Sequence, residues 1–188
     1  MRKLLKFSTI LIFIIALALI IGFFALPEIE RKFVYKIEYS DIVERCANET
    51  GLDKYFIYAV IKTESNFNEN ATSNVGARGL MQLMPDAFDW VKYRMGDKRD
   101  ITYDGMFNAE NNIEYGTHML MLLKQKYGSE ELALAAYHGG MTTVDNWLKD
   151  GTISKDGKTV EEIPSKATAF YVEKVLKAWQ SYKNLYDN

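Results

Sequence analysis

The 188-residue sequence has one cysteine, two histidines and no surplus of charge, with a formal net charge of −2. The lone Cys46 excludes an internal disulfide framework, and it lies on an apolar helical stripe, so we expect it in the core. A bulk nucleic-acid binder is disfavoured because it would need a surplus of Lys and Arg. The chain lacks a G-x-x-x-x-G-K-[ST] phosphate loop and an H-E-x-x-H motif, and His118 and His138 lie twenty residues apart with no cysteine nearby. We therefore expect no metal site and no cofactor.

One long run without charge stands near the N-terminus. Residues 7–26 are uncharged and mostly apolar, and about 20 residues suffice for a tilted helix to cross a hydrocarbon core. Residues 1–6 hold three basic and no acidic side chains, so they are predicted to stay in the cytoplasm while the rest faces outside. The only A-x-A triplet near the N-terminus, at 16–18, lies inside the run, which favours an uncleaved, single-pass membrane anchor over a cleaved signal peptide.

The rest of the chain is acidic. The first 26 residues hold three of the 23 basic side chains and none of the 25 acidic ones, so the remaining 162 residues carry a net charge of −5. An apolar fraction of 48% and a charged fraction of 26% are typical of a globular protein and exclude wholesale disorder. We interpret 27–37 as a juxtamembrane stalk and 38–188 as one exported domain.

Apolar residues recur with helical spacing almost throughout that domain, which predicts a mainly α fold with at most a small β-hairpin. The hairpin is expected at 152–160, where Asp156 and Gly157 lie between flanks rich in Thr and Ile. Caps at Asp53 and Ser129, and stops at Gly51, Gly96 and Gly128, mark helix ends. The expected helices cover about 38–50, 54–65, 85–95, 108–127, 129–138, 142–149 and 165–184.

The segment 62–85, KTESNFNENATSNVGARGLMQLMP, carries the most informative residue, Glu64. Glu64 lies at the end of an apolar helix, where the negative end of the helix dipole and the apolar surroundings both disfavour its ionised form. Both effects raise the pKa of the carboxyl, as a general acid near neutral pH requires. On this local evidence alone, an exposed glutamate without function remains the alternative.

Further segments point to a known family. Three motifs follow one another in an order that is specific for this family: E-S-x-F-N from Glu64, S-x-x-G-A-x-G-L-M-Q-x-M-P from Ser73, and A-x-A-A-Y up to Tyr137. Asn112, Ile113 and Gly116 in one expected helix, and Ile163-Pro164 leading to Tyr171-Val172, fit the same order. The chain resembles the catalytic domain of the soluble-type lytic transglycosylases over about 50–180. These enzymes share a lysozyme-like fold with goose-type lysozyme.

The resemblance implies cleavage of the β-1,4 bond between N-acetylmuramic acid and N-acetylglucosamine in peptidoglycan glycan strands. In that family the muramic 6-hydroxyl attacks its own anomeric carbon and leaves a 1,6-anhydro end. Ordinary glycosidases need two carboxylates at the bond, and no matching segment supplies a partner for Glu64. The resemblance therefore implies that Glu64 serves first as general acid and then as general base.

Five further residues fall on positions that line the sugar cleft in the family: Ser73, Met81, Gln82, Tyr137 and His138. Gln82 can donate to and accept from acetamido sugars, and Tyr137 is expected to hydrogen-bond the catalytic carboxyl. Met81 is either an adaptable surface for a sugar or core filling, and His138 is either a substitute for a family asparagine or structural. Gly76, Gly79 and Gly140 are interpreted as turn glycines.

The sequence departs from the family at two places. His138-Gly139 stands where Asn-Ala is usual, and Ala167 stands where a glutamate is usual. The aromatic residues Trp90, Tyr93 and Tyr103 are compatible with sugar stacking and with core packing.

Two alternatives to the lytic reaction stay open: a muramidase on the same fold that uses water, and a non-catalytic glycan-binding component of an envelope-spanning machine. The expected partners are glycan strands, the membrane through 7–26 and cell-envelope machinery.

Overall fold

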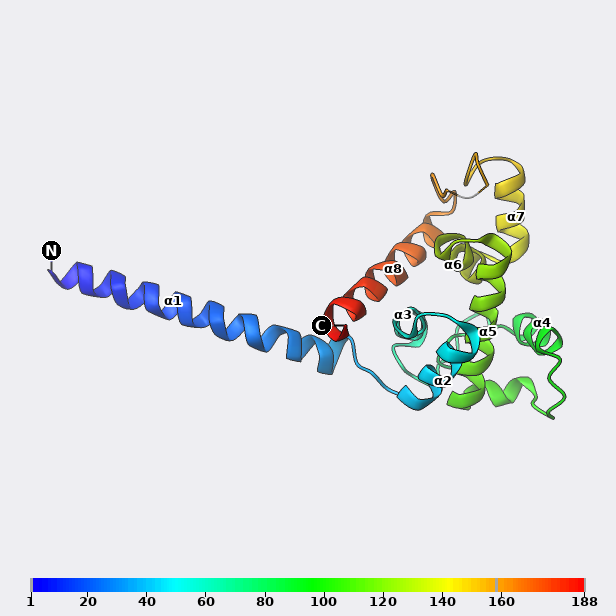
Figure 1. Cartoon of the computed structure of the whole chain (residues 1–188), viewed down its shortest axis with the longest axis horizontal. Helices are drawn as coiled ribbons and strands as arrows, with labels where there is room; N and C mark the ends of the chain where they lie inside the picture. Colours follow the sequence, from blue (N-terminus) through cyan, green and yellow to red (C-terminus); the bar gives the residue numbers. More distant parts are fainter. Residues whose placement is uncertain (1, 158, 188) are drawn as a thin grey trace. The chain divides into compact units, whose positions relative to one another are not determined.

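The computed structural model describes residues 2–157 and 159–187, and within the first helix it describes side chains from residue 13 onward, apart from 18, 20 and 24. The chain divides into two compact units, Met1–Ile37 and Glu38–Asn188 (Figure 1).

The first unit is one long helix, α1 (Arg2–Ile29), followed by the π-helical turn η1 (Glu30–Val34). The α-helix continues through Pro27. Three residues later, at Glu30, its hydrogen bonding changes to the π-helical pattern of η1. Within η1 the backbone N–H of Tyr35 donates to the carbonyl of Glu30 at 2.7 Å. Proline has no N–H to donate, so a wider turn soon after it accommodates the interrupted hydrogen-bond ladder.

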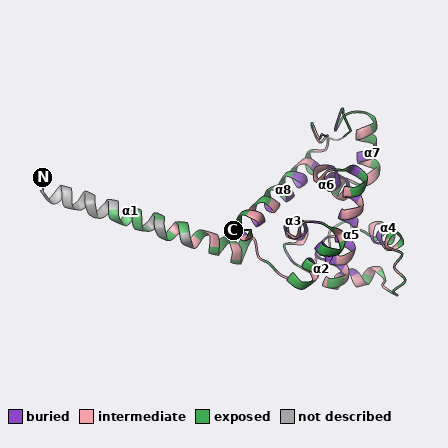
Figure 2. Cartoon of the chain, viewed as in Figure 1, coloured by how far each residue is buried: buried purple, intermediate pink, exposed green. Residues whose placement is uncertain are grey.

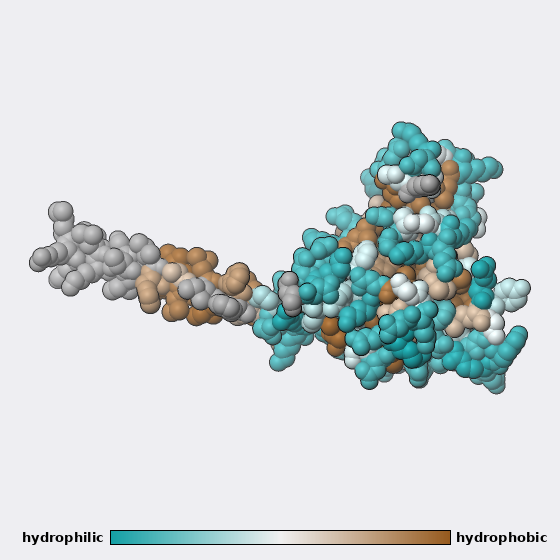
Figure 3. Space-filling view, viewed as in Figure 1, coloured by the Kyte–Doolittle hydropathy of each residue, from teal (hydrophilic) through white to brown (hydrophobic). Residues whose placement is uncertain are grey.

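The described part of this unit is apolar and uncovered. The segment Phe13–Val34 has a mean hydropathy of 2.1, and none of its most apolar window is buried. Figure 3 shows much of the described part of this stretch in brown. By length and composition it could cross a membrane, a property that a secretory signal sequence shares.

The second unit is built from helices, and no β-strand occurs among its described residues. The elements are α2 (Ser40–Thr50), α3 (Lys54–Ser65), α4 (Pro85–Met95), the 3-10 turn η2 (Tyr103–Phe107), α5 (Ala109–Tyr127), α6 (Glu130–Gly139), α7 (Met141–Lys149) and α8 (Lys166–Tyr186). The prediction of a mainly α domain is confirmed, and the helix ends lie within three residues of those expected from the sequence.

Local capping explains those ends. The side chain of Asp53 accepts from the backbone N–H of Tyr55 at 2.7 Å at the start of α3, and Ser129 accepts from Leu132 at the start of α6. Gly51, Gly96 and Gly128 adopt the left-handed conformation at the C-termini of α2, α4 and α5.

The core of this unit forms around α3. All seven residues from Tyr55 to Ile61 are buried, so apolar neighbours surround the helix on every side (Figure 2). It packs on α8 and α2, while α5 contacts α2, α4 and α6. An apolar run that is buried all round holds its C-terminal end, at Glu64 and Ser65, in a well-determined position.

The connection from α3 to α4 is an irregular segment held by two isolated β-bridges. Arg78 pairs with Thr72 on one side and with Leu83 on the other. The Arg78 guanidinium also lies 4.4 Å from the ring centre of Tyr103 and forms an ion pair with Asp104 at 2.5 Å. Arg78 therefore fastens this segment to η2.

The hairpin expected at 152–160 does not form a ladder among its described residues, and residue 158 lies outside them. Between the described residues on its two sides, one backbone bond crosses the segment, from the N–H of Glu161 to the carbonyl of Ile153 at 2.9 Å. The Asp156 carboxylate accepts instead from the Ser154 hydroxyl and from the backbone and hydroxyl of Thr159. This local turn competes with strand pairing, and the described residues agree with the prediction of at most a small hairpin.

Candidate active site

Glu64 lies in the last turn of α3, half-buried, beside the segment that leads to α4. The neighbouring Ser65 hydroxyl donates to the carbonyl of Leu80 at 2.8 Å. This bond ties the end of α3 to the G-L-M-Q turn, so the carboxyl and the turn are positioned together.

The backbone around Glu64 is strained. Asn66, Phe67 and Gln82 have φ values of 49°, 66° and 48°, in the left-handed region that non-glycine residues seldom adopt. They account for three of the four such residues in the described chain. Strain of this kind persists where packing enforces it and is concentrated at functional sites.

The electrostatics of Glu64 suit proton transfer near neutral pH. Burial raises the pKa of its carboxyl to about 7, although a hydrogen bond from Tyr171 and the positive charge of Lys174 both act to lower it. The Tyr171 hydroxyl donates to Glu64 Oε1 at 2.7 Å. The carboxyl is thus poised to release and regain a proton near neutral pH.

The tyrosine that bonds this carboxyl is not the one expected from the sequence. The Tyr137 hydroxyl donates to the backbone carbonyl of Met81 at 2.6 Å, and Tyr171 on α8 takes the place beside Glu64. Tyr171 is 107 residues away from Glu64 in the chain, so no local pattern reveals the contact. In the sequence, Tyr171 is marked only by its place seven residues after Pro164, in a segment that carries the family resemblance.

The G-L-M-Q turn is held by one buried amide. The Asn112 side chain, fully buried on α5, accepts from the backbone N–H of Met81 at 2.7 Å and donates to the carbonyls of Arg78 and Met106 at 2.9 and 2.8 Å. Three bonds from a single buried side chain fix the turn against α5 and η2. Gly79, with φ of 76°, lets Asn112 approach.

The Met81 side chain is fully buried, so of the two interpretations left open by the sequence the structure supports core filling. A β-carbon at Gly116 would overlap the Met81 side chain, and the Thr117 hydroxyl lies 4.0 Å from its sulfur. Gly116 therefore admits Met81 to the core, and the polar atom that Met81 offers to the site is its backbone carbonyl, already bonded by Tyr137.

Gln82 and Ser73 both brace the backbone of the same segment. Gln82 Nε2 donates to the carbonyls of Gly79 and Ala71 at 2.8 and 3.1 Å, while the Ser73 hydroxyl accepts from the N–H of Ala77 at 2.9 Å. Both side chains are half-buried. Bonds of this kind stiffen the segment between α3 and α4.

His138 contacts the tyrosine that bonds the Glu64 carboxyl. Its ring stacks on Tyr171 with centroids 4.6 Å apart and an interplanar angle of 26°, and its Nδ1 lies 3.2 Å from the Thr168 hydroxyl. Burial lowers the pKa of the imidazole, so the ring is neutral at pH 7. The stacked His138 ring thus helps to orient Tyr171.

The two departures from the family pattern lie around this stack. A β-carbon at Gly139 would come within 3.3 Å of the Thr168 hydroxyl, which in turn contacts His138. Because Gly139 has no β-carbon, it leaves room for the His138 imidazole and the Thr168 hydroxyl. Ala167 is exposed in the first turn of α8.

The three aromatic residues with open assignments separate in the structure. The Tyr103 hydroxyl donates to the carbonyls of Gly76 and Leu83, which makes it a structural residue. Tyr93 is 84% exposed and projects from α4. Trp90, half-buried on the same helix, lines a hollow that also includes Tyr137 and His138.

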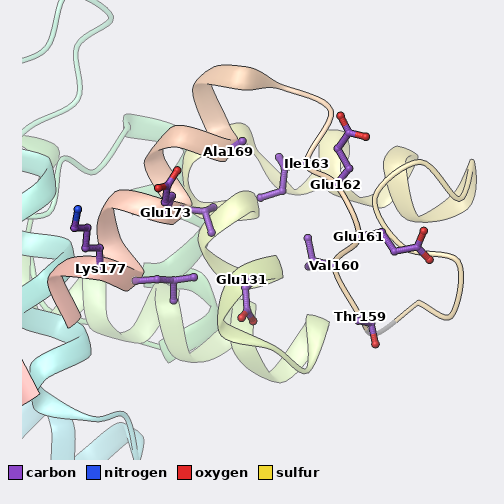
Figure 4. Close-up of a pocket in the computed structure, with 11 residues that line it drawn as sticks. Glu131, Thr159, Val160, Glu161, Glu162, Ile163, Ala169, Glu173 and Lys177 are labelled. Carbon is purple, nitrogen blue, oxygen red and sulfur yellow. The ribbon is translucent and has the colours of Figure 1, made fainter. Parts of the chain in front are cut away.

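A larger hollow of about 640 Å³ lies between α6, α8 and the segment 159–163 (Figure 4). It is lined by Glu131, Thr159, Val160, Glu161, Glu162, Ile163, Ala169, Val172, Glu173, Leu176 and Lys177. None of the candidate site residues lines it, so size alone does not locate the chemistry of this domain.

The geometry therefore combines one half-buried carboxyl of raised pKa, a tyrosine donor that bonds it, and a turn fixed by buried hydrogen bonds. Such a site can protonate a leaving oxygen and afterwards accept a proton. A mainly helical domain with a single acid at the end of its central helix belongs to the lysozyme-like class.

The chain is a member of the family of the transglycosylase SLT domain, whose model matches residues 41–159, more than half of the chain. The matched segment contains Glu64, Ser73, Gln82 and His138 but ends before Tyr171.

Two relatives show the range of the likeness. The chain is 32% identical over 151 residues to a soluble lytic murein transglycosylase of Salmonella typhimurium, covering 79% of this chain and 23% of that protein. It is 30% identical over 166 residues to a membrane-bound lytic murein transglycosylase C of Histophilus somni, covering 77% of this chain and 46% of the relative. The chain thus spans less than half the length of these relatives.

Two solved structures share the fold. The 70 kDa soluble lytic transglycosylase of Escherichia coli superposes with a TM-score of 0.72 at 29% identity, covering 80% of this chain and 25% of that one. A lytic transglycosylase of Pseudomonas aeruginosa, described as an inactive mutant in which a glutamate is replaced by glutamine, gives a TM-score of 0.71 at 28% identity, covering 82% and 25%.

Replacing Tyr171 by Phe tests the bond to the carboxyl. Because the hydroxyl lowers the pKa of Glu64, its removal is expected to raise that pKa above 7 and to move the alkaline limb of the pH–rate profile upward by up to about one pH unit. We expect kcat to fall about tenfold as the carboxyl loses its orientation. Tyr137→Phe is the matched control, and an equal shift of the alkaline limb there would contradict the assignment to Tyr171.

Proposed function

We propose that this protein is a membrane-anchored lytic transglycosylase that cleaves the β-1,4 bond between N-acetylmuramic acid and N-acetylglucosamine in peptidoglycan. The observation that carries the proposal is Glu64, a single half-buried carboxyl with a pKa of about 7 at the end of the central helix. Family membership and the activities named for the relatives support the substrate class.

The environment of Glu64 favours a mechanism with one carboxyl. Among the described residues, Lys174 is the charged side chain that perturbs the pKa of Glu64, and no second carboxylate contributes to the shift. Two carboxylates of an ordinary glycosidase lie about 5–9.5 Å apart and would interact electrostatically.

In the proposed reaction, protonated Glu64 donates its proton to the glycosidic oxygen as the C1–O bond breaks. The N-acetylglucosamine unit leaves with a free 4-hydroxyl. Ionised Glu64 then takes the proton of the muramic 6-hydroxyl as its oxygen bonds to C1. The carboxyl returns to its protonated state, and the product ends in a 1,6-anhydro ring. Tyr171 and Lys174 stabilise the transient carboxylate.

The placement at the membrane is part of the proposal. Residues 7–26 would form a single-pass anchor with 1–6 in the cytoplasm, 27–37 would form the stalk, and the catalytic domain at 38–188 would face the cell wall. The uncovered apolar side chains of Phe13–Val34 and the membrane-bound relative support this arrangement. A link to envelope-spanning machinery would follow from such a location.

The product of digestion tests the reaction. Full-length protein in detergent, incubated with purified peptidoglycan, is expected to release muropeptides with anhydro ends, one water lighter than reducing ends, as measured by mass spectrometry. Reducing ends would establish the hydrolytic muramidase instead. Absence of any release, with glycan still bound, would identify a non-catalytic glycan-binding protein.

A further inference from the structure

We propose that Trp90 forms the floor of a sugar-binding subsite next to the catalytic carboxyl, and that the indole receives the apolar CH face of a pyranose ring of the glycan strand. The inference rests on the proposed function, since the occupant is the same strand that Glu64 would cleave. It adds a binding residue to the candidate site that lies outside the motifs of the resemblance.

The site is a hollow of about 330 Å³ between the beginning of α4 and the junction of α6 and α7. Its volume falls within the range of roughly 300–1,000 Å³ that ligand pockets occupy. It is lined by Met84, Asp86, Ala87, Trp90, Met119, Ala136, Tyr137, His138, Gly139, Gly140 and Met141. A mostly apolar lining with a few polar groups is the usual composition of a ligand site.

Two contacts connect the lining of the hollow to Glu64. His138, which lines it, stacks on Tyr171, and Tyr171 donates to the Glu64 carboxyl at 2.7 Å. Tyr137, also in the lining, bonds the carbonyl of Met81 in the fixed G-L-M-Q turn. One ring therefore separates the hollow from the side chain that holds the catalytic carboxyl, so a strand bound at Glu64 extends naturally into it.

The lining suits the face of a sugar. A pyranose presents several C–H groups on one face and hydroxyls around its edge, and an indole offers a broad, rigid apolar surface to the former at little entropic expense. Three methionines, Met84, Met119 and Met141, supply adaptable contacts for acetamido or lactyl methyl groups. The Arg94 guanidinium lies 5.9 Å from the Trp90 ring centre and helps to hold the indole.

The same helix offers a matched control. Tyr93 is an aromatic residue three positions along α4, 84% exposed and absent from the lining of the hollow. If aromatic character on α4 were enough to bind glycan, Tyr93 and Trp90 would contribute alike. The proposed subsite requires an effect at Trp90 alone.

The first experiment compares Trp90→Ala, Trp90→Phe and Tyr93→Ala with the parent on soluble, uncrosslinked glycan strands. Loss of one stacking contact is expected to raise KM about tenfold in Trp90→Ala and less in Trp90→Phe, with kcat little changed because Glu64 and Tyr171 are untouched. Tyr93→Ala should match the parent. Unchanged KM in a folded Trp90→Ala, or a loss confined to kcat, would overturn the proposal.

The second experiment measures binding without turnover. Glu64→Gln protein is titrated with tetra-N-acetylchitotetraose, and the tryptophan emission is compared with that of Glu64→Gln/Trp90→Phe. We expect an emission change on binding that the double variant lacks. An identical change in both would place the sugar against another tryptophan and overturn the proposal.

The two proposals fail in different ways. Anhydro products from the parent together with no role for Trp90 would remove the subsite and leave the function intact. A Trp90-dependent emission change without any release of glycan would retain the subsite and remove the catalytic function.

Discussion

Replacing Glu64 by Gln is expected to abolish turnover of peptidoglycan, by about 1,000-fold or more, while leaving glycan binding intact. The amide has nearly the shape of the protonated carboxyl but cannot give a proton to the leaving oxygen or accept one from the muramic hydroxyl. Release of soluble muropeptides measures the loss, and the exposed Glu173→Gln on α8 serves as the control. A Glu64→Gln protein that digests as fast as the parent would exclude Glu64 as the acid and base.

The same substitution has a pH-dependent effect on stability. Burial raises the folded-state pKa of Glu64 from 4.5 to about 7, so the folded protein binds this proton more tightly than the unfolded chain does. The resulting stabilisation is fully present below the unfolded pKa and is lost as pH rises through about 7. We therefore expect the Tm of Glu64→Gln to increase relative to that of the parent as the pH is raised from 5 to 8. A constant difference in Tm would contradict the raised pKa.

The second large effect is expected at Gly79, in the turn that faces Glu64. A β-carbon there would overlap the backbone carbonyl of Met106 and the side-chain amide of Asn112, and φ is 76°. Neither neighbour can move easily, because the Asn112 amide makes three hydrogen bonds in the core. We expect Gly79→Ala to lower the free energy of unfolding by about 3–5 kcal/mol and to reduce activity strongly.

Comparison with Gly76→Ala isolates the steric part of the effect expected for Gly79→Ala. Gly76 also has a positive φ, of 91°, but no atom lies within 4 Å of the place its β-carbon would occupy. We expect Gly76→Ala to lower the free energy of unfolding by only about 1–2 kcal/mol, the energetic penalty of a positive φ at a residue with a β-carbon. Urea denaturation of both variants measures the difference, and equal destabilisation would show that the approach of Asn112 to Gly79 is not important.

Features that depend on neighbouring residues were predictable from the sequence. Asp53 and Ser129 begin helices because their side chains accept from backbone N–H groups two or three residues on, and Gly51, Gly96 and Gly128 end helices because glycine adopts positive φ at little energetic penalty. The raised pKa of Glu64 was also predictable, since an apolar helix leads directly to it.

The segment 152–160 shows the limit of local reasoning. Asp156 followed by Gly157 is a turn signal, but the turn that forms is closed by the Asp156 side chain and not by paired strands. Whether strands pair depends on whether backbone hydrogen bonds between them are more favourable than local bonds from a side chain such as that of Asp156. The residue types in the turn do not reveal which of the two is favoured.

The scarcity of cysteine and of surplus charge, the long apolar run and the order of motifs around Glu64 were sufficient to predict an anchored, mainly helical domain with one catalytic carboxyl. Tertiary structure alone decided that Tyr171 rather than Tyr137 bonds Glu64, that Met81 points into the core, and that Trp90 rather than Tyr93 lines the hollow. Periodicity and caps depend on residues a few positions apart. The contacts of the site join α3, α6 and α8 across 30 to 107 residues, and only the packing of those helices brings them together.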